Sequence, residues 1–296
     1  MTKVRADQAG RLLDVVKGLF PDWKTTTLKQ RLKAGQVMVN DKVAHSGAAQ
    51  IKRGDAIEIL SRPAGSRIQF PPHLGPPPLE ILYADDDLIA VDKPFALLSV
   101  ATAREKNLTA IHVMREWLSG LGAQSRDNLH AAHRLDREAS GVLLLARSLS
   151  VKKKLAADWR TFEKVYLALC DGIPAESEGT ITVPLWEDKG LFVRPAVHGD
   201  GEEAVTHYRV LQSVGGRTLF EVRLGTGRKH QIRVHLAHIG CPIVGDLRYG
   251  KSKAKRLALH ASRLKIFHPV TGLEVVIQAK TPKFFKNRLT VDLSTK

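Results

Sequence analysis

The segment AHRLDREASGVLLLARS (residues 132–148) joins a charged loop to an apolar run. Asp136 lies between Arg134 and Arg137, and the apolar run covers Val142–Ala146. Short apolar runs of this kind are typical of buried strands. Binding and catalytic residues are frequent on loops that a rigid scaffold positions. The segment therefore predicts a carboxylate on a loop at the mouth of a buried strand.

A carboxylate beside fixed guanidinium groups stays ionised, because the opposite charge favours the anion. An ionised carboxylate in a partly dry site can act as a nucleophile or as an electrostatic stabiliser. The alternative is a surface Arg–Asp ion pair, which contributes about 0–1 kcal/mol. The buried run that follows Asp136 favours an active site over this alternative.

The whole chain has 296 residues, 43% apolar composition, a formal net charge of +16 and a pI of about 10.0. This length permits two domains and a sizeable hydrophobic core. A strongly basic balance favours polyanionic partners, either nucleic acid or a membrane surface. We find no apolar run of about 18 residues, no lipidation signal and no basic amphipathic helix with a bulky apolar face, so we expect no membrane partner.

The N-terminal stretch MTKVRADQAGRLLD has no apolar core and carries Asp7 and Asp14, which argues against a signal or transit peptide. The two cysteines, Cys170 and Cys241, lie far apart in the sequence. This usage does not suggest a disulfide framework and fits a reducing compartment. We therefore expect a cytoplasmic protein.

Residues 1–62 form a basic unit with twelve Lys/Arg and six Asp/Glu. Apolar residues at helical spacing predict a helix over residues 12–20, and a second helix is expected over 25–34. The segment QVMVNDKVA (36–44) predicts two strands around a turn, and RGDAIEIL (53–60) a further turn and strand. A basic, solvated helix face is one interpretation of the charges and RNA binding is the other. The predicted RNA contacts of this unit are Lys24, Lys29, Arg31 and Lys33.

Residues 63–78 contain six prolines and two glycines, which predicts a stiff, extended spacer. We therefore expect a second domain over residues 79–296, which opens with strand, acidic turn and strand in LEILYADDDLIAVDKP (79–94). Strands and helices do not alternate as βαβ units in this domain. We thus predict an α+β domain with a mixed, largely antiparallel sheet. The expected helices cover residues 109–118, 150–159 and 229–239, and the expected strands 142–146, 164–169, 204–211, 219–224 and 256–267.

A second charged segment, GTGRKHQIRVHLAHIGCPIVGDLRYG (225–250), begins with a tight turn at Thr226-Gly227 and continues into the helix predicted over 229–239. Arg228 and Arg233 are expected in the first turns of that helix. Either guanidinium can then face a site at the start of the helix. The alternative is a basic helix with a solvated face.

Histidines 230, 235 and 238 and Cys241 raise the question of a metal site. On a helical wheel they fall at about 0°, 140°, 80° and 20°, and Cys241 lies beyond the helix stop at Gly240. Zinc ligands must converge on one point. We therefore expect no metal.

Tyr166, in FEKVYLALCDG, lies in an alternating apolar strand. It can be a core tyrosine with its hydroxyl at the edge, or a flat surface on which a base stacks. The sequence has no phosphate loop and no dinucleotide-binding fingerprint, so we expect no nucleotide cofactor. A glycosidase with paired carboxylates is possible in principle, but we can place no second carboxylate opposite Asp136.

Five segments between residues 79 and 272 resemble, in the right order, the RluA-type family of pseudouridine synthases. They are LEILYADDDLIAVDKPFALLSV, HRLDREASGVLLLAR, FEKVYLAL, TGRKHQIRVHLAHIGCPIVGDLRYG and LALHASRLKIFHPVTG. Residues 1–62 resemble the small RNA-binding domain named after ribosomal protein S-four. Ala139 and Lys229 depart from the family pattern, since threonine is usual at both positions. Neither change removes a catalytic group.

The resemblance implies an isomerase that converts uridine in RNA to pseudouridine. It implies that Asp136 is the nucleophile, that Arg233 pairs with it, and that Tyr166 stacks on the uracil and helps to remove the proton from C5. Attack on ribose C1′ and attack on the base both remain open. The target uridine must be flipped out of its stack, and Arg134 is expected to fill the gap. No cofactor or metal is implied, because an isomerisation transfers neither electrons nor phosphate.

Further RNA contacts are expected at Arg228 and Lys229. The family association favours ribosomal RNA as the substrate and leaves transfer RNA as the other candidate, and the sequence sets no oligomeric state. A non-catalytic RNA-binding or ribosome-assembly factor on the same scaffold is the alternative, since the basic charge needs no chemistry. Asp136 in the HRLD motif argues against it.

Overall fold

The structure is a computed structural model that describes residues 2–40, 42–60, 70–122, 128–188, 190, 192–196, 201–252 and 254–285. The chain divides into two compact units. The first comprises Met1–Gln69, Asp85–Asp87 and Ile266–Val275, and the second comprises Phe70–Ala84, Leu88–Lys265 and Val276–Lys296. We call them the N-terminal unit and the large unit.

The predicted spacer at residues 63–78 lies outside the described residues as far as residue 69. Its remainder is not extended throughout, because Pro72–Leu74 forms a 3-10 turn. The first residue of such a turn does not need its backbone N–H for a hydrogen bond within the turn, so proline can occupy this position.

The N-terminal unit contains a four-stranded antiparallel sheet in the order β1-β6-β3-β4. Its strands are β1 (Thr2–Arg5), β6 (Ala56–Ile59), β3 (Val37–Val39) and β4 (Lys42–Val43), and β2 (Gly10–Arg11) pairs separately with β5 (Gln50–Ile51). The two predicted helices are present as α1 (Leu12–Leu19) and α2 (Thr25–Lys33). Apolar residues from both helices share one core with Val37, Ile57 and Ile59.

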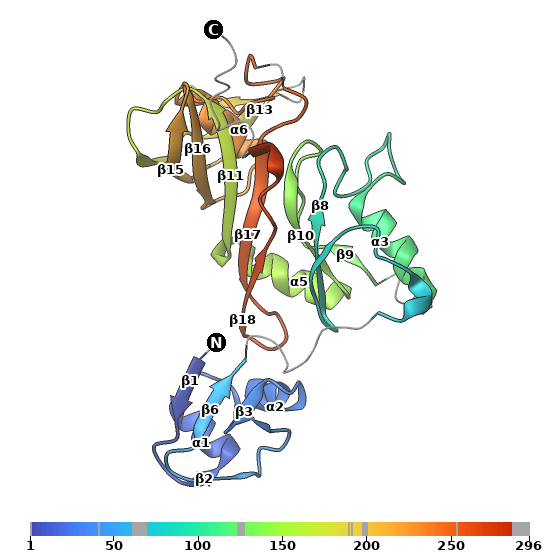
Figure 1. The fold of residues 1–296 in the computed structure, drawn as a ribbon, viewed down its shortest axis with the longest axis vertical. Coiled ribbons are helices and arrows are strands. Elements are labelled where there is room, and N and C mark those ends of the chain that lie inside the picture. Colours follow the sequence, from blue (N-terminus) through green and yellow to red (C-terminus); the bar gives the residue numbers. More distant parts are fainter. Residues whose placement is uncertain are drawn as a thin grey trace. The chain divides into compact units, whose positions relative to one another are not determined.

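The large unit is built on one sheet, in the order β12-β15-β16-β11-β17-β10-β8-β7 (Figure 1). Neighbours are antiparallel except β10 and β17, which are parallel. The predicted α+β class with a mixed, largely antiparallel sheet is confirmed. The strands are β7 (Ile81–Ala84), β8 (Leu88–Lys93), β10 (Ser140–Ala146), β11 (Glu163–Asp171), β12 (Glu178–Ile181), β15 (Thr206–Val214), β16 (Arg217–Leu224) and β17 (Leu259–Phe267), with β9 (His130–Ala131) on β10 and β18 (Glu274–Gln278) on β17.

Helices cover both halves of this sheet (Figure 1). One apolar core joins α3 (Ala110–Leu118) to β8 and β10, and a second joins α6 (Gln231–His238) to β11, β16 and β17. Helix α5 (Leu149–Asp158) follows β10, and the hairpin of β13 (Leu185–Glu187) and β14 (Val193–Pro195) packs near α6. Within the described ranges, no helix combines the length and the apolarity that a membrane crossing requires.

Strand β10 explains the apolar run that follows the charged loop. All seven of its residues are buried, since strands pair with both of its edges and its side chains are covered on both faces. Gly141 has a φ of 114°, and a Cβ there would lie 2.2 Å from the carbonyl oxygen of Ala261 on β17. Only glycine permits this close approach. The loop that carries Asp136 is thereby fixed to the centre of the sheet.

Candidate active site

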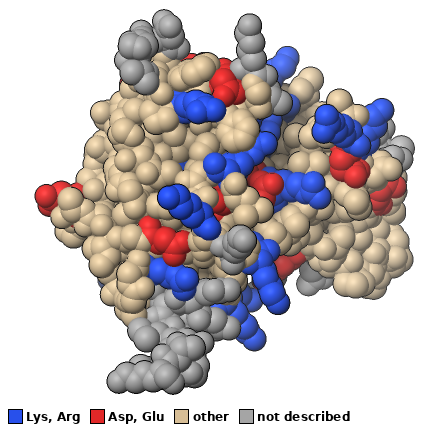
Figure 2. All heavy atoms as spheres, turned by 90° about the horizontal axis from the view of Figure 1, so that it is seen from above, with Lys and Arg blue, Asp and Glu red and all other residues tan. Residues whose placement is uncertain are grey.

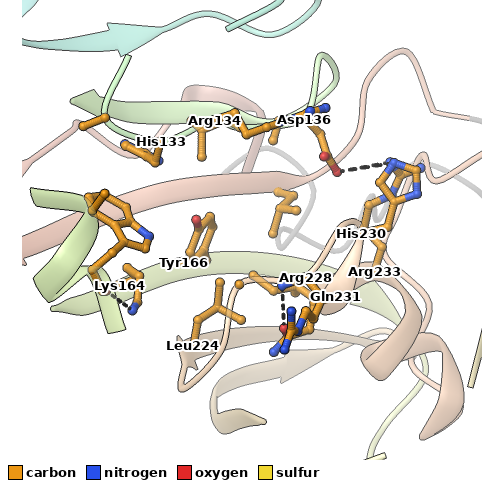
Figure 3. A pocket seen from close by; sticks show the side chains of 18 residues that line it. His133, Arg134, Asp136, Lys164, Tyr166, Leu224, Arg228, His230, Gln231 and Arg233 are labelled. Carbon is orange, nitrogen blue, oxygen red and sulfur yellow. Dashed lines mark hydrogen bonds and ion pairs between the residues drawn. The ribbon is translucent and has the colours of Figure 1, made fainter. Parts of the chain in front are cut away.

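A cavity of about 370 Å³ opens between the loop before β10, strand β11 and the start of α6 (Figure 3). This volume lies in the range of about 300–1,000 Å³ that is usual for ligand pockets. Five residues predicted from the sequence line it, namely Arg134, Asp136, Tyr166, Arg228 and Arg233. The fold therefore brings together side chains that are up to 99 positions apart.

The loop that carries Asp136 is held on both sides of this residue. On one side, Ser99 Oγ donates to the Leu135 carbonyl at 2.8 Å and accepts from the Leu135 N–H at 2.9 Å. On the other side, the fully buried Lys93 donates through Nζ to the Arg137 carbonyl at 3.3 Å. Burial lowers the pKa of Lys93 to about 8, although the charge of Asp136 opposes the shift. These contacts leave the Asp136 side chain 21% exposed, facing the cavity.

Arg233 lies in the first turn of α6 and its side chain is only 4% exposed. Its Nη1 is 3.3 Å from Asp136 Oδ2, as drawn in Figure 3. A second carboxylate holds the rest of the guanidinium, since Asp246 accepts from Nε at 2.7 Å and from Nη2 at 2.9 Å. Burial alone would lower the pKa of Arg233, but the hydrogen bonds and negative charges of Asp246 and Asp136 raise it above the ordinary value.

Asp246 is a site residue that the sequence reasoning missed. It is 1% exposed and also accepts hydrogen bonds from the backbone N–H groups of Arg248 and Tyr249. Burial alone would raise the pKa of Asp246, but the hydrogen bonds and charge of Arg233 lower it overall. A charged Asp246 thus fixes the direction in which Arg233 presents Nη1 to Asp136. Its lone carboxylate in GDLRYG gave no local signal of this pairing.

Tyr166 projects from β11 into the cavity, between the loop of Asp136 and the segment before α6 (Figure 3). Burial raises its pKa, and the negative charge of Asp136 adds to the shift. The phenol therefore stays protonated near neutral pH. A neutral ring beside the carboxylate offers a flat surface for a base.

One end of the cavity is closed by an aromatic wall that the sequence reasoning did not identify. His133 stacks on Trp159 with 4.7 Å between ring centroids, and Lys164 Nζ donates to the Trp159 carbonyl at 3.0 Å. Burial lowers the pKa of His133 to about 4. Its Nε2 accepts from the Leu144 N–H at 3.0 Å. His133 is therefore a neutral, fixed ring rather than an acid or base at neutral pH.

The other predicted RNA contacts of this unit lie around the cavity. Arg134 is exposed at its edge. Arg228 pairs with Glu202 at 2.9 Å, and Lys229 pairs with Glu187. Both cations are about one-third exposed, so each remains accessible while it is paired.

The predicted start of the helix at residue 229 is wrong, because α6 begins at Gln231. His230 has a left-handed φ of 53°, which interrupts the helix. The Gln231 side chain accepts from the Arg228 N–H at 2.9 Å, so this backbone donor ahead of the helix is satisfied by a side chain. Arg228 therefore precedes the helix, and only Arg233 lies in its first turn.

In the N-terminal unit, Lys24, Lys29 and Lys33 are exposed at the start and on the outer face of α2. Arg31 is 1% exposed, so the prediction of Arg31 as an RNA contact is wrong. Its guanidinium lies 3.4 Å above the Trp23 ring, and its Nε donates to the Thr271 carbonyl at 2.9 Å within the same unit. The position two residues after Lys29 faces the opposite side of the helix, which is the buried side.

Of the histidines weighed as metal ligands, His235 is engaged elsewhere. Both ring nitrogens of the buried His235 have partners, Thr206 and the Val183 carbonyl. Among the described residues, one group lies close enough to share an ion, and it consists of Asp85, Asp87 and His268. His268 Nδ1 accepts from two backbone N–H groups, so its Nε2 carries the proton and faces Asp85 at 3.0 Å. In this tautomer Nε2 has no lone pair for a metal.

Comparisons with known proteins point to one family. The family model described as RNA pseudouridylate synthase matches residues 87–238. Ribosomal large subunit pseudouridine synthase D of Haemophilus influenzae is 32% identical over 302 residues, which cover 96% of this chain and 91% of the relative. The protein of the same name from Escherichia coli strain K12 is 30% identical over 299 residues, which cover 95% and 90%. The solved structure of Human RNA Pseudouridylate Synthase Domain Containing 4 has a TM-score of 0.59 at 27% identity, over 71% of this chain and 91% of that one.

The mixed sheet is similar to that of a solved RNA pseudouridylate synthase domain, and enzymes of this class are RNA-modifying isomerases. The chain belongs to the RNA pseudouridylate synthase family, and it is an RNA pseudouridine synthase. The resemblance to the RluA-type family is confirmed. The resemblance of residues 1–62 to the S-four domain stays a prediction.

Proposed function

We propose that the enzyme isomerises uridine in large-subunit ribosomal RNA, with Asp136 as its nucleophile. The observation that carries the proposal is the position of Asp136, partly exposed in the cavity with Oδ2 at 3.3 Å from Arg233. An ionised carboxylate is needed to start the reaction, and the buried guanidinium supports that state. The names of the relatives support ribosomal RNA as the substrate. A ribosomal substrate also fits the cytoplasmic location expected from the sequence.

Asp136 initiates an exchange of bonds at one nucleotide. The bond from ribose C1′ to uracil N1 breaks, the base turns, and a bond from C1′ to C5 forms. C5 loses its proton and N1 gains one, so substrate and product are isomers. Tyr166 supplies the surface on which the base rests while it turns, since its neutral ring lies beside the carboxylate.

Access to the cavity requires the uridine to leave its stack, which costs a few kcal/mol. Arg134 is exposed at the edge of the cavity, where a cationic side chain can occupy the gap that the base leaves. The stacked His133 and Trp159 offer a second flat surface inside the cavity. Flipping is therefore supported from both sides of the pocket.

Binding of the RNA backbone is the role that we assign to the basic surface. Figure 2 shows Lys and Arg side chains along a band across the middle of one face. In the N-terminal unit, the exposed Lys24, Lys29 and Lys33 supply the phosphate contacts. Replacing all three by glutamine reduces the slope of log affinity against log salt by about 2–3, because each lost contact releases one counterion fewer. Lys17→Gln on α1 is the control. An equal slope in the triple variant and in Lys17→Gln would mean that Lys24, Lys29 and Lys33 do not contact RNA.

The substrate class is tested by tritium release from RNA labelled at uridine C5. Unmodified large-subunit ribosomal RNA, partly assembled ribosomal particles and transfer RNA are offered separately to the wild-type enzyme. We expect release from the ribosomal substrates and none from transfer RNA. Release from transfer RNA alone would contradict the proposed substrate and leave the isomerase assignment intact.

A further inference from the structure

His230 occupies an unusual position beside the proposed nucleophile. It directly precedes α6 with φ 53° and ψ 15°, a left-handed conformation that is uncommon for residues other than glycine. Such conformations persist where surrounding contacts hold them, and they cluster at active sites. The His230 side chain is 11% exposed and lines the cavity, with Nε2 at 3.9 Å from Asp136 Oδ2 (Figure 3).

The hydrogen bonds of Tyr249 favour one tautomer of this imidazole. Tyr249 Oη accepts from the Val193 N–H at 3.2 Å and lies 2.8 Å from His230 Nδ1. The Tyr249 hydroxyl can donate its proton to His230 Nδ1 if Nδ1 carries a lone pair. The proton of the neutral imidazole then sits on Nε2, which faces Asp136. Burial lowers the pKa of His230 although the charge of Asp136 opposes the shift, which agrees with a neutral ring.

The two oxygens of Asp136 have different surroundings. Arg233 Nη1 and His230 Nε2 both approach Oδ2, at 3.3 and 3.9 Å. Within the described chain, Oδ1 makes no hydrogen bond or ion pair. Tyr249 contacts both side chains, because the Arg233 guanidinium lies 5.2 Å from its ring centroid and the His230 ring meets it edge to face at 5.6 Å.

We infer that His230 is a positioning residue that holds Asp136 Oδ2 together with Arg233, so that Oδ1 is the atom that attacks the substrate. This inference rests on the proposed role of Asp136 as the nucleophile. At 3.9 Å the Nε2–H group lies beyond hydrogen-bond distance of Oδ2, but its dipole favours this orientation of the carboxylate without adding a second full charge. Tyr249 acts one step further away, by fixing the tautomer of His230.

The first test replaces His230 by glycine, which accepts the left-handed backbone and removes the imidazole. His230→Asn is the second variant, since asparagine tolerates the same conformation and keeps an N–H donor on a shorter side chain. His238→Ala removes an exposed imidazole from the last turn of α6 and serves as the matched control. Single-turnover rates, KM and RNA affinity are measured for all three and for Asp136→Asn.

We expect His230→Gly to lower the single-turnover rate about tenfold to a hundredfold, with KM and RNA affinity within about twofold of wild type. His230→Asn recovers part of the rate, and His238→Ala stays at the wild-type level. A merely structural role would instead reduce the folded fraction and leave the rate per folded molecule unchanged. Full activity of His230→Gly beside an inactive Asp136→Asn would overturn this inference and leave the proposed function standing. An active Asp136→Asn would contradict the proposed function itself.

Tyr249→Phe provides a second test, which leaves the His230 backbone and side chain in place. We expect Tyr249→Phe to reduce the rate, and the double variant to be no slower than His230→Gly alone, because both changes act through one imidazole. Nitrogen-15 NMR of the wild-type His230 ring is expected to show the Nε2–H tautomer. A ring protonated on Nδ1, or fully additive effects of the two substitutions, would overturn the assignment.

Discussion

Replacing Asp246 by asparagine removes one charge from the buried pair that orients Arg233 and leaves the shape of the side chain almost unchanged. The Nε–Oδ2 distance of 2.7 Å corresponds to a Coulomb attraction of about 6 kcal/mol at an effective dielectric constant of about 20. Desolvation of both groups offsets part of this, since their side chains are 4% and 0% exposed. Breaking such a buried pair on one side costs about 3–5 kcal/mol.

We therefore expect Asp246→Asn to lower the free energy of unfolding by about 3–5 kcal/mol, and the midpoint of thermal unfolding by about 6–20 °C. The single-turnover rate should fall at least tenfold at temperatures where the variant is folded, because Arg233 loses the partner that fixes its direction. Asp171→Asn is the matched control. Its carboxylate pairs with Arg217 at 3.1 Å, but both side chains are about one-third exposed, so that loss is about 0–1 kcal/mol.

The pH dependence of this effect has a defined sign. The pKa of Asp246 is lowered in the folded protein, so its contribution is fully present above the unfolded carboxyl pKa of about 3.9. The stabilisation by Asp246 is lost as the pH falls below this value and through the lower pKa that Asp246 has in the folded protein. The difference in stability between wild type and Asp246→Asn should therefore narrow in acid. Urea unfolding at pH 7 and pH 3 measures it, and a loss of stability no larger than that of Asp171→Asn at pH 7 would refute the reasoning.

Three further outcomes are expected. Tyr166→Phe keeps RNA affinity within about twofold, whereas Tyr166→Ala loses about 1–3 kcal/mol of binding in a filter-binding assay, because the ring supplies a stacking surface. Arg31→Met leaves the salt dependence of RNA binding unchanged, whereas Lys29→Met lowers its slope by about 0.7–0.9, because only the lysine is exposed. Burial lowers the pKa of Lys93 to about 8 in the folded protein, from 10.5. The free-energy cost of burying the charged ammonium is therefore fully present below pH 8, and it decreases as the pH rises from 8 toward 10.5. Urea unfolding should therefore show the stability of wild type rising relative to Lys93→Met over that interval.

Elements with a strong periodic pattern could be predicted from the sequence. The buried strand at Val142–Ala146, the helix at residues 109–118 and the alternating strand around Tyr166 are present within a few residues of their predicted bounds. Strand β1 was missed, because its four residues TKVR carry little apolar alternation and form a strand only by pairing with β6.

The candidate site could be predicted where a residue stands in a segment with a family pattern, as Asp136, Tyr166 and Arg233 do. Asp246 could not be predicted, because its role depends on a contact with Arg233 that only the folded chain creates. His230 was considered only as a metal ligand, since the left-handed backbone that turns it toward Asp136 has no local sequence signal. The prediction for Arg31 was wrong because the charges of α2 do not by themselves indicate which face of the helix is buried.

Asp136 is the centre of this account, and its role is tested most directly by comparing wild type with Asp136→Asn on ribosomal RNA labelled with tritium at uridine C5. RNA affinity is measured in parallel, because the substitution keeps the shape of the side chain. The account predicts tritium release by the wild-type enzyme, no release by Asp136→Asn, and affinities that agree within about twofold. Release by Asp136→Asn, with deamidation of the asparagine excluded by mass spectrometry, would contradict it.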